Sequence, residues 1–291
     1  MRVLILGGDG MLGHRLLAHL TPRHEVRVTL RRPLAEYERF GLFHRGNACP
    51  EVDVRDAAAL DRAFADFAPH AAVNAVGILK RRADPRIDAL SMEVNAIAAH
   101  LVARVCRSHG ARLVHLSTDC VFSGKKGNYS EQDRPDPEDV YGLSKLLGEA
   151  GGAGVLTLRT SMIGPELDRK TGLVEWFLSQ RNTGGPVRGW RRAIFSGFTT
   201  AELARLIEKL LTAHPQAAGL YHASAAAISK LNLLSALERR LKLGIAIEPV
   251  DEPYRDRSLD STRFRTAFGY APPAWDVMLD ELAAELLRAS P

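Results

Sequence analysis

The chain opens with a short apolar run that is followed at once by three evenly spaced glycines. Residues 3–6 are predicted to form a buried strand, and Gly7, Gly10 and Gly13 have the spacing Gly-x-x-Gly-x-x-Gly ahead of a predicted helix. Glycines allow a tight turn and a close approach of the backbone to a ligand. The N-terminus of the helix then attracts an anion. An ordinary glycine-rich turn is the alternative, but this context favours binding of a dinucleotide diphosphate by Gly7, Gly10, Met11, Leu12 and Gly13.

Strand and helix patterns alternate along the first half of the chain. The predicted strands cover residues 3–6, 25–30, 51–54, 71–76, 112–116 and 155–159. The predicted helices cover residues 11–20, 57–67, 87–109 and 141–150. This alternation predicts an α/β protein with a doubly wound parallel sheet, the Rossmann fold, since right-handed crossovers place helices on both faces of the sheet.

The second half of the chain is less regular. Further helices are predicted at residues 172–180, 200–211, 229–242 and 275–289, and further strands at 219–223 and 245–249. We expect residues 1–160 plus about 195–223 to form the dinucleotide-binding domain. Residues 161–194 and 224–291 would then form a smaller, partly interleaved lobe that binds the substrate.

The composition is that of a soluble globular protein, with 46% hydrophobic and 25% charged residues among 291. No apolar run is expected to span a bilayer. Three cysteines without metal-ligand spacing predict free thiols in a reducing cytoplasm and no metal site. The net charge of +5 is modest and the basic residues are scattered, which argues against nucleic acid and favours acidic small molecules such as nucleotide phosphates.

The residues after the second predicted strand bear on which dinucleotide is bound. NAD-binding chains of this kind carry an acidic residue about 20 residues after the glycine turn, where it binds the ribose 2′-OH. This chain has Arg31 and Arg32 there instead. Guanidinium groups suit the 2′-phosphate of NADP. The sequence therefore favours NADP over NAD, with a pair of solvated surface charges as the alternative.

Residues that end the third and fourth predicted strands are expected to line the cofactor: Asp53, Val54, Ala75, Val76 and Gly77. The Asp53 carboxylate would accept a hydrogen bond from the adenine amino group, with a solvent-exposed strand end as the alternative. Asn95 lies in the following long helix, and a buried Asn needs hydrogen-bond partners. A structural role in bracing the fourth strand is therefore as well supported as a catalytic one.

A hydroxyl donor stands ahead of a Tyr and Lys pair further along the chain. Thr118 follows Ser117 after a predicted strand, and Tyr141 and Lys145 lie four residues apart in a predicted helix. Residues four apart share a helix face, so we expect the Lys145 ammonium to lie beside Tyr141 and lower the pKa of its phenol. Thr118 would donate a hydrogen bond to a substrate oxygen. This set favours proton transfer in nicotinamide-dependent carbonyl chemistry.

Together these residues resemble the extended short-chain dehydrogenase/reductase superfamily and, within it, the dTDP-4-dehydrorhamnose reductase-like family of nucleotide-sugar reductases. The resemblance is carried by Gly7 to Gly13, Ser117-Thr118-Asp119-Cys120-Val121-Phe122, the run from Tyr129 to Glu149 that contains Tyr141-Gly142-x-Ser144-Lys145, Leu158-Arg159-Thr160, and Arg257-Ser258-Leu259-Asp260-Ser261. It covers most of the chain and is looser in the second half, where substrate specificity is set.

The resemblance implies a reductase that uses NADPH, or NADH, to reduce the C4 ketone of a nucleotide-diphosphate deoxysugar. It implies that Tyr141 is the general acid, that Lys145 lowers the pKa of Tyr141 and anchors the cofactor ribose, and that Thr118 orients the carbonyl. Asp119 and Cys120 would contact the substrate, although family members often carry Tyr in place of Cys120. The Glu that follows the Asp in nucleotide-sugar dehydratases is absent, which argues against dehydration.

Candidates for binding the sugar nucleotide in the second lobe are Trp176, Arg188, Trp190 and Arg257, with Arg191 as a further one. Lobe core and solvated surface are the alternatives for these aromatic and basic residues. Two other functions remain open on the same fold. One is a sugar-nucleotide epimerase, and the other is a non-catalytic NADP-binding subunit like the regulatory subunit of methionine adenosyltransferase. A homodimer is also possible.

Overall fold

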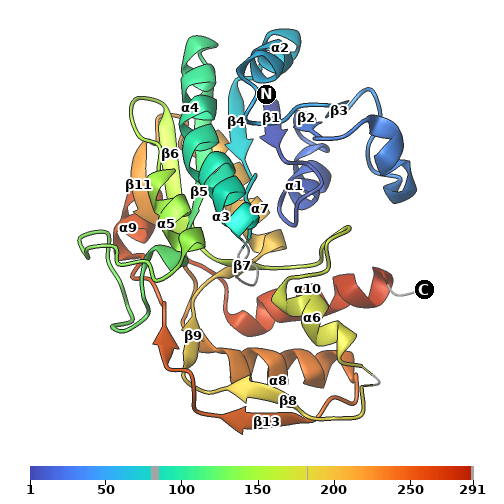
Figure 1. Ribbon diagram of the computed structural model, residues 1–291, viewed down its shortest axis with the longest axis vertical. Helices are drawn as coiled ribbons and strands as arrows, with labels where there is room; N and C mark the ends of the chain where they lie inside the picture. The colour runs from blue at the N-terminus through green and yellow to red at the C-terminus, as the bar shows by residue number, and fades with distance from the viewer. Residues whose placement is uncertain (80–84, 182, 290–291) are drawn as a thin grey trace.

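A parallel sheet of seven strands forms the centre of the computed structural model, which describes residues 1–79, 85–181 and 183–289 (Figure 1). The strand order is β11-β6-β5-β4-β1-β2-β3. The strands are β1 (Arg2–Leu6), β2 (Glu25–Thr29), β3 (Ala48–Cys49), β4 (Ala71–Asn74), β5 (Arg112–Thr118), β6 (Val155–Thr160) and β11 (Gly219–His222). The doubly wound α/β fold predicted from the sequence is confirmed. The order reverses beside β1, and at such a point the strand ends leave a crevice for ligands.

Helices cover both faces of this sheet. One face carries α1 (Gly13–Leu20) and α7 (Thr200–Ala213), and the other carries α2 (Ala57–Phe67), α4 (Ala98–Ser108) and α5 (Val140–Leu147). Successive residues of β1 alternate between the two cores: Val3 and Ile5 face the first, and Leu4 and Leu6 face the second. This two-residue period explains why β1 is apolar throughout, since a strand covered on both faces needs no polar side.

The third strand is shorter and begins earlier than predicted. β3 covers only Ala48–Cys49, not residues 51–54. Pro50 has no N–H for a sheet hydrogen bond, and Glu51 has a left-handed φ of 59°. The chain nevertheless stays beside the end of β2, because the Val52 N–H donates to the Leu30 carbonyl oxygen at 3.0 Å.

The long helix on the second face changes its winding partway along. It begins as α3 (Pro85–Ser91), widens into a π-helical turn, η2 (Met92–Ile97), and continues as α4. Contrary to the expectation from the sequence, residues 86–108 are long and apolar enough to cross a membrane. However, 56% of the apolar stretch is buried inside the fold. It packs against β4 and β5, as a core helix does.

The second lobe lies beyond the carboxyl ends of the strands, in the lower part of Figure 1. Its helices are α6 (Leu173–Ser179), α8 (Lys230–Leu241) and α10 (Trp275–Ala289), whereas α9 (Thr262–Phe268) packs beside the edge strand β11 of the large sheet (Figure 1). The short strands outside the large sheet are β7 (Met162–Ile163), β8 (Val187–Trp190), β9 (Ala193–Phe195), β10 (Phe198–Thr199), β12 (Ile228–Ser229), β13 (Ile247–Val250) and β14 (Arg255–Asp256). The buried cluster under α1 and α7 continues into α8 and α10. One apolar core therefore joins the two parts of the chain.

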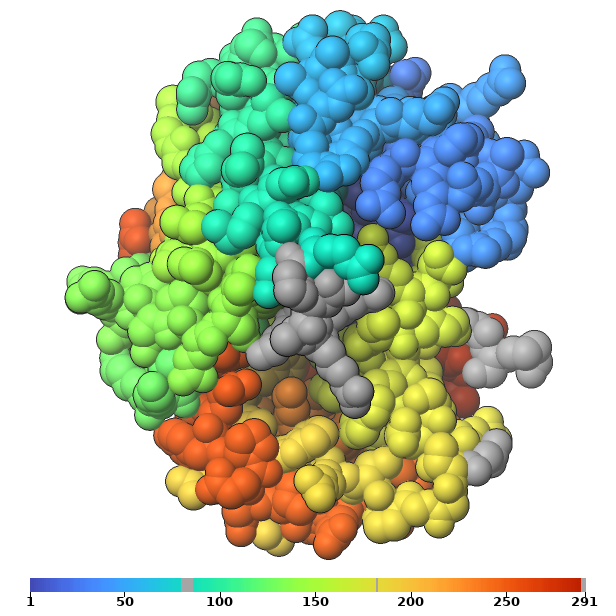
Figure 2. All heavy atoms as spheres, viewed as in Figure 1, coloured from blue at the N-terminus to red at the C-terminus, as the bar shows by residue number. Residues whose placement is uncertain are grey.

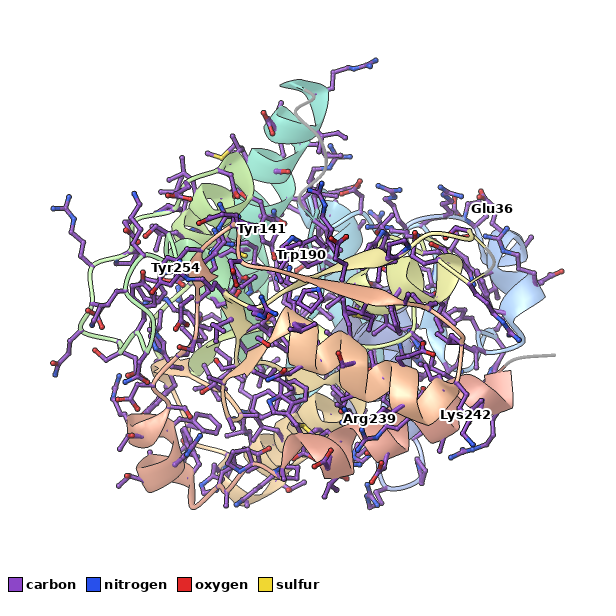
Figure 3. The ribbon with its side chains drawn as sticks, turned by 90° about the horizontal axis from the view of Figure 1, so that it is seen from below. Glu36, Tyr141, Trp190, Arg239, Lys242 and Tyr254 are labelled. Atoms are coloured by element: carbon purple, nitrogen blue, oxygen red, sulfur yellow. The ribbon has the colours of Figure 1, made fainter. Side chains whose placement is uncertain are left out.

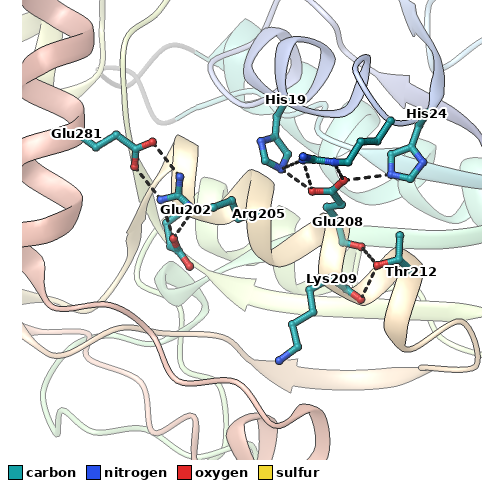
Figure 4. Close-up of polar contacts among 9 residues, drawn as sticks. His19, His24, Glu202, Arg205, Glu208, Lys209, Thr212 and Glu281 are labelled. Atoms are coloured by element: carbon teal, nitrogen blue, oxygen red, sulfur yellow. Dashed lines mark hydrogen bonds and ion pairs between the residues drawn. The ribbon is translucent and has the colours of Figure 1, made fainter.

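Polar contacts reinforce this junction around α7 (Figure 4). Glu208 on α7 accepts hydrogen bonds from Arg23 and from the side chains of His19 and His24, at 2.6–3.2 Å. Further along α7, Arg205 reaches both carboxylate oxygens of Glu281 on α10, at 2.7 and 2.8 Å. Helix α7 thus links the first helix of the chain to the last.

Gly148, at the end of α5, offers a test of how tightly α5 packs on η2. A Cβ atom built on Gly148 would lie 1.8 Å from the backbone oxygen of Asn95. We expect Gly148→Ala to lower the free energy of unfolding by about 1–3 kcal/mol, measured by urea titration, because backbone must move to relieve the overlap. Gly151→Ala is the control, since nothing lies within 4 Å of its Cβ position. Equal losses in the two variants would contradict this account.

Candidate active site

A continuous trench runs along the carboxyl ends of the central strands. One hollow is lined by residues that follow β1, β2 and β4, together with Val52 to Arg55. A second is lined by the glycine turn, the end of β5, α5 and the segment after β6. It is called the catalytic cleft below, for the residues that the sequence predicts to be catalytic. The two hollows share the following residues: Asp9, Gly10, Ala75, Val76, Gly77 and Arg169. The first hollow is called the adenine hollow below, for the group that the sequence predicts there.

The glycine turn is shaped by contacts that no side chain could tolerate. Gly7 has a φ of 85°. A Cβ on Gly13 would lie only 2.0 Å from the Gly7 carbonyl oxygen. Gly13 therefore brings the start of α1 against the end of β1, while Gly7 and Gly10 line the adenine hollow. Met11 and Leu12 line the catalytic cleft.

The predicted adenine contacts lie together at one end of the trench. Asp53 and Val54 line the adenine hollow, although they lie in a loop after β3 and not in the strand itself. Arg55 donates to both carboxylate oxygens of Asp53, at 3.0 and 2.7 Å, and reaches Glu93 at 2.7 Å. Hydrogen bonds from Arg55 lower the pKa of Asp53. Asp53 is therefore a fixed, ionised hydrogen-bond acceptor in this wall.

The two arginines after β2 differ in their surroundings. Arg31 lines the adenine hollow and a neighbouring hollow, while Arg32 lines only the neighbouring one. The Arg32 guanidinium lies 3.0 Å from the Glu36 carboxylate. Arg31 forms no ion pair within the part of the chain that the structure describes.

Asn95 supports the trench from behind. Its side chain is buried, and its amide accepts from the Ile78 N–H at 2.9 Å and donates to the Ile78 carbonyl oxygen at 3.0 Å. It also donates to the Ser144 hydroxyl of α5 at 3.1 Å. Both amide hydrogens are thus committed to protein atoms. Asn95 therefore links two elements of the site. It holds the segment after β4, which contains Ala75, Val76 and Gly77, against helix α5.

Thr118, Tyr141 and Lys145 meet on the wall of the catalytic cleft. Thr118 ends β5, and the other two lie one turn apart on α5, whose first turn is capped by Asp139 accepting from the Gly142 N–H at 2.8 Å. A Cβ on Gly142 would lie 2.2 Å from the Cys120 carbonyl oxygen. Gly142 therefore lets α5 approach the turn that follows β5 closely, and the Thr118 hydroxyl lies near enough to Tyr141 to influence its pKa.

Burial is the largest influence on the pKa values of Tyr141 and Lys145. It raises the pKa of Tyr141, with Cys120 adding to the rise and the Thr118 hydroxyl opposing it. It lowers the pKa of Lys145 to about 8, partly offset by the Glu149 carboxylate. Burial thus outweighs the lowering of the Tyr141 pKa that the sequence predicts, and the effect of Lys145 on Tyr141 stays a prediction. The Lys145 ammonium donates to the Leu116 carbonyl oxygen at 2.5 Å.

A buried ion pair supports the end of α5. Glu149 receives two hydrogen bonds from Arg159 on β6, at 2.7 and 2.8 Å, and one from the Ser117 hydroxyl on β5 at 2.7 Å. The two charged side chains are only 9% and 6% exposed. The pair ties α5 to two adjacent strands directly behind Thr118 and Lys145.

Two cations of the second lobe, Arg257 and Lys230, lie close to Asp119 and Cys120 and are called the cationic wall below, although neither lines the cleft itself. Arg257 donates from Nη1 to Cys120 Sγ at 3.1 Å, whereas its Nε and Nη2 atoms are buried without a hydrogen-bond partner. Gly124 and Gly127 allow this approach, since a Cβ on either would lie within 3 Å of the segment from Arg255 to Arg257. Burial raises the pKa of Asp119, and the charges of Arg257 and Lys230 oppose the rise.

The remaining second-lobe candidates lie further out. The rings of Trp176 and Trp190 pack 5.9 Å apart at the edge of the apolar core, and neither lines the catalytic cleft. Figure 3 labels Trp190 on β8 and Tyr141 on α5. The Lys230 ammonium lies 5.7 Å from the centre of the Trp190 ring; burial lowers its pKa, and Asp119 and Cys120 oppose this fall. Arg188 is exposed on β8.

Sequence reasoning missed three charged side chains of the site: Glu149, Arg169 and Lys230. Glu149 and Arg159 both lie in stretches that carried the family resemblance, but nothing in their spacing predicted that they pair. Arg169 and Lys230 reach the site only through the folding of the second lobe. The three cysteines are free, as predicted.

Comparisons with known proteins indicate one family for this chain. A family model described as RmlD substrate binding domain matches residues 1–288. The bovine methionine adenosyltransferase 2 subunit beta is 30% identical over 58% of this chain and 48% of its own. A dTDP-4-dehydrorhamnose reductase of Streptomyces griseus is 35% identical over 51% of this chain and 43% of its own. The chain thus spans about half the length of these curated relatives.

Solved structures match over nearly the whole chain. A hypothetical dTDP-4-dehydrorhamnose reductase of Sulfolobus tokodaii has 29% identity and a TM-score of 0.77, covering 96% of this chain and 98% of the other. A dTDP-4-dehydrorhamnose reductase of Bacillus anthracis, solved with NADP, has 22% identity and a TM-score of 0.79, covering 98% and 99%. The latter likeness shows the shared fold.

The buried pair behind the catalytic helix gives a stability test. We expect Glu149→Gln to lower the free energy of unfolding by about 3–5 kcal/mol, because it leaves the Arg159 guanidinium buried without a counter-charge. Urea titration measures the change. Glu138→Gln is the control, since Glu138 pairs with Lys125 and Arg255 near the surface and should lose about 1 kcal/mol or less. A loss for Glu149→Gln no larger than the control's would refute the role of the pair.

Proposed function

This chain belongs to the family described as RmlD substrate binding domain, and on that premise we propose that it is an NAD(P)H-dependent reductase of a nucleotide-diphosphate sugar. The C4 ketone of a 6-deoxysugar is the proposed acceptor. One observation carries the proposal: Thr118, Tyr141 and Lys145 line a cleft that is continuous with the glycine turn. This arrangement supports a role for Tyr141 as a proton donor beside the predicted dinucleotide site.

The proposed chemistry adds a hydride and a proton across a carbonyl group. The nicotinamide cofactor would supply the hydride to the carbonyl carbon. Tyr141 would give its phenolic proton to the carbonyl oxygen while the Thr118 hydroxyl orients that oxygen. General acid catalysis of this kind is worth about two to four orders of magnitude in rate. A bulk proton would then restore the phenol.

Lys145 would oppose the burial that makes Tyr141 a weak acid. Its ammonium stabilises a nearby phenolate only while it is protonated. Since burial lowers the pKa of Lys145 to about 8, this charge is present at neutral pH and is lost as the pH rises through 8. A cytoplasmic location, which we also predict, would keep the group mostly charged.

The cationic wall supports binding of the sugar nucleotide. If the Arg257 side chain turned from Cys120 into the cleft, its two nitrogens that have no partner here would pair with a diphosphate, and Lys230 would add a second charge. Asp119 and Cys120 line the cleft beside them and are proposed to meet the sugar. Trp176, Arg188 and Trp190 stay weaker proposals, as outer parts of the same binding face. Homodimer formation also stays a prediction.

Two other functions are distinguished by simple observations. A sugar-nucleotide epimerase would hold its dinucleotide through purification, and a regulatory subunit would bind NADP without turning over any keto sugar. The similarity to methionine adenosyltransferase 2 subunit beta supports the second alternative. The intact set of Thr118, Tyr141 and Lys145 favours a catalyst. A screen of dTDP- and UDP-linked 4-keto sugars for NADPH consumption decides between them.

Tyr141→Phe tests the proton donor. It removes only the phenolic hydroxyl, so we expect turnover of a 4-keto sugar nucleotide to fall at least about a hundredfold while NADPH affinity stays the same. Tyr221→Phe is the control, because Tyr221 lies on β11 in an aromatic cluster outside the cleft. Unchanged turnover in Tyr141→Phe would show that another group delivers the proton.

Arg257→Gln tests the anion site in the second lobe. We expect the Michaelis constant for the sugar nucleotide to rise about tenfold or more, as for loss of a charge-assisted hydrogen bond, with cofactor affinity unchanged. Steady-state kinetics and NADPH titration measure the two effects. Arg192→Gln removes an exposed charge of the same lobe and should change neither. A Michaelis constant that does not change would place Arg257 outside the substrate site.

A further inference from the structure

Four arginines surround a hollow beyond the adenine end of the trench. Arg31, Arg32 and Arg39 belong to the segment after β2, and Arg169 belongs to the loop between β7 and α6. In Figure 2 the yellow-green surface of the second lobe meets the blue surface of the segment after β2 on this side. The hollow is therefore built from both lobes.

Two of these arginines are already neutralised by carboxylates: Arg32 by Glu36 at 3.0 Å, and Arg39 by Asp168 at 2.6 Å. Arg31 and Arg169 form no ion pair with any carboxylate in the described ranges. They are also the two of the four that line both this hollow and the adenine hollow. The unpaired positive charge is thus concentrated where the two hollows join.

Asp9 lies at the same junction and opposes this charge. It lines both the adenine hollow and the hollow with the four arginines. Tyr37 lines the latter hollow; burial raises its pKa most, and the Asp9 carboxylate raises it further. A phosphate beside Arg31 alone would meet the positive charge of Arg31 and the negative charge of Asp9, whose effects on it oppose each other. A second guanidinium leaves a net positive charge, which an added phosphate requires. Arg169 is the residue that supplies it.

We propose that Arg169 of the second lobe and Arg31, in the segment after β2, together bind the 2′-phosphate of NADP where the two hollows join. This rests on the proposed function only in taking an adenine dinucleotide as the ligand. Arg169 would thereby help to determine the preference for NADP over NAD. Arg32, held by Glu36, would contribute less than its position after β2 suggests.

The loop that carries Arg169 is held in shape by its own hydrogen bonds and lies beside the glycine turn. Glu166 accepts hydrogen bonds from the Thr171 and Gly172 N–H groups, at 2.5 and 2.7 Å. A Cβ on Gly172 would lie 2.8 Å from the end of the Met11 side chain. The loop therefore lies close to the proposed path of the cofactor. A phosphate held by Arg31 and Arg169 would link the second lobe to the sheet.

Calorimetric titration of the full chain with NADPH and with NADH tests the proposal. We expect Arg169→Gln to weaken NADPH binding about tenfold or more and to leave NADH binding unchanged. Lys170→Gln, which removes the neighbouring charge paired with Glu175, should change neither affinity. Asp9→Asn should act in the opposite direction and favour NADPH over NADH. Thermal melts confirm that each variant is folded.

Three results would overturn the proposal. Equal weakening of NADPH and NADH by Arg169→Gln would assign Arg169 to a group that both cofactors share, such as the diphosphate. Unchanged affinities would remove Arg169 from the cofactor site. A wild-type chain that binds neither dinucleotide would refute both this site and the proposed reductase. If the selective loss is found but no keto sugar is reduced, the 2′-phosphate site stands and only the proposed substrate fails.

Discussion

The close approach of α5 to the end of β5 is the contact on which the rest of the site depends. Gly142 permits it at one end of the helix, where a Cβ would meet the Cys120 carbonyl oxygen, and Gly148 permits a similar approach to η2 at the other. Between these glycines, Asn95 holds the buried Ser144. The helix that carries Tyr141 is thus positioned by backbone contacts that leave little freedom, as a preorganised site requires.

The sequence predicted well those features that depend on local pattern. The turn from β1 into α1 needs only an apolar run and correctly spaced glycines, and both are visible in the first residues of the chain. The meeting of Thr118 with Tyr141 and Lys145 was also predicted, because the end of a parallel strand and the following helix open on the same edge of the sheet. β3 was misplaced, since the effect of Pro50 and Glu51 outweighed the apolar pattern.

Features that depend on burial or on distant contacts were not predictable in this way. Spacing along a helix places Lys145 near Tyr141 but does not say how far each is removed from water, and here desolvation dominates the pKa of both. Arg257 reaches Cys120 because loops more than a hundred residues apart exchange backbone hydrogen bonds, such as that from the Tyr129 N–H to the Ser258 carbonyl oxygen. No short-range pattern encodes such a contact.

The apolar core that runs from α1 and α7 into α8 and α10 limits how this protein can diversify. Because the two parts bury one common surface, the second lobe is not an exchangeable module. A recombination event that replaced the second lobe would also have to replace the matching face of α7. Ion pairs across the junction, such as that between Arg205 and Glu281, would have to be matched too. New substrate ranges on this scaffold would therefore arise by single substitutions along the cleft wall, and the position of Cys120 is one where a small side chain leaves room for them.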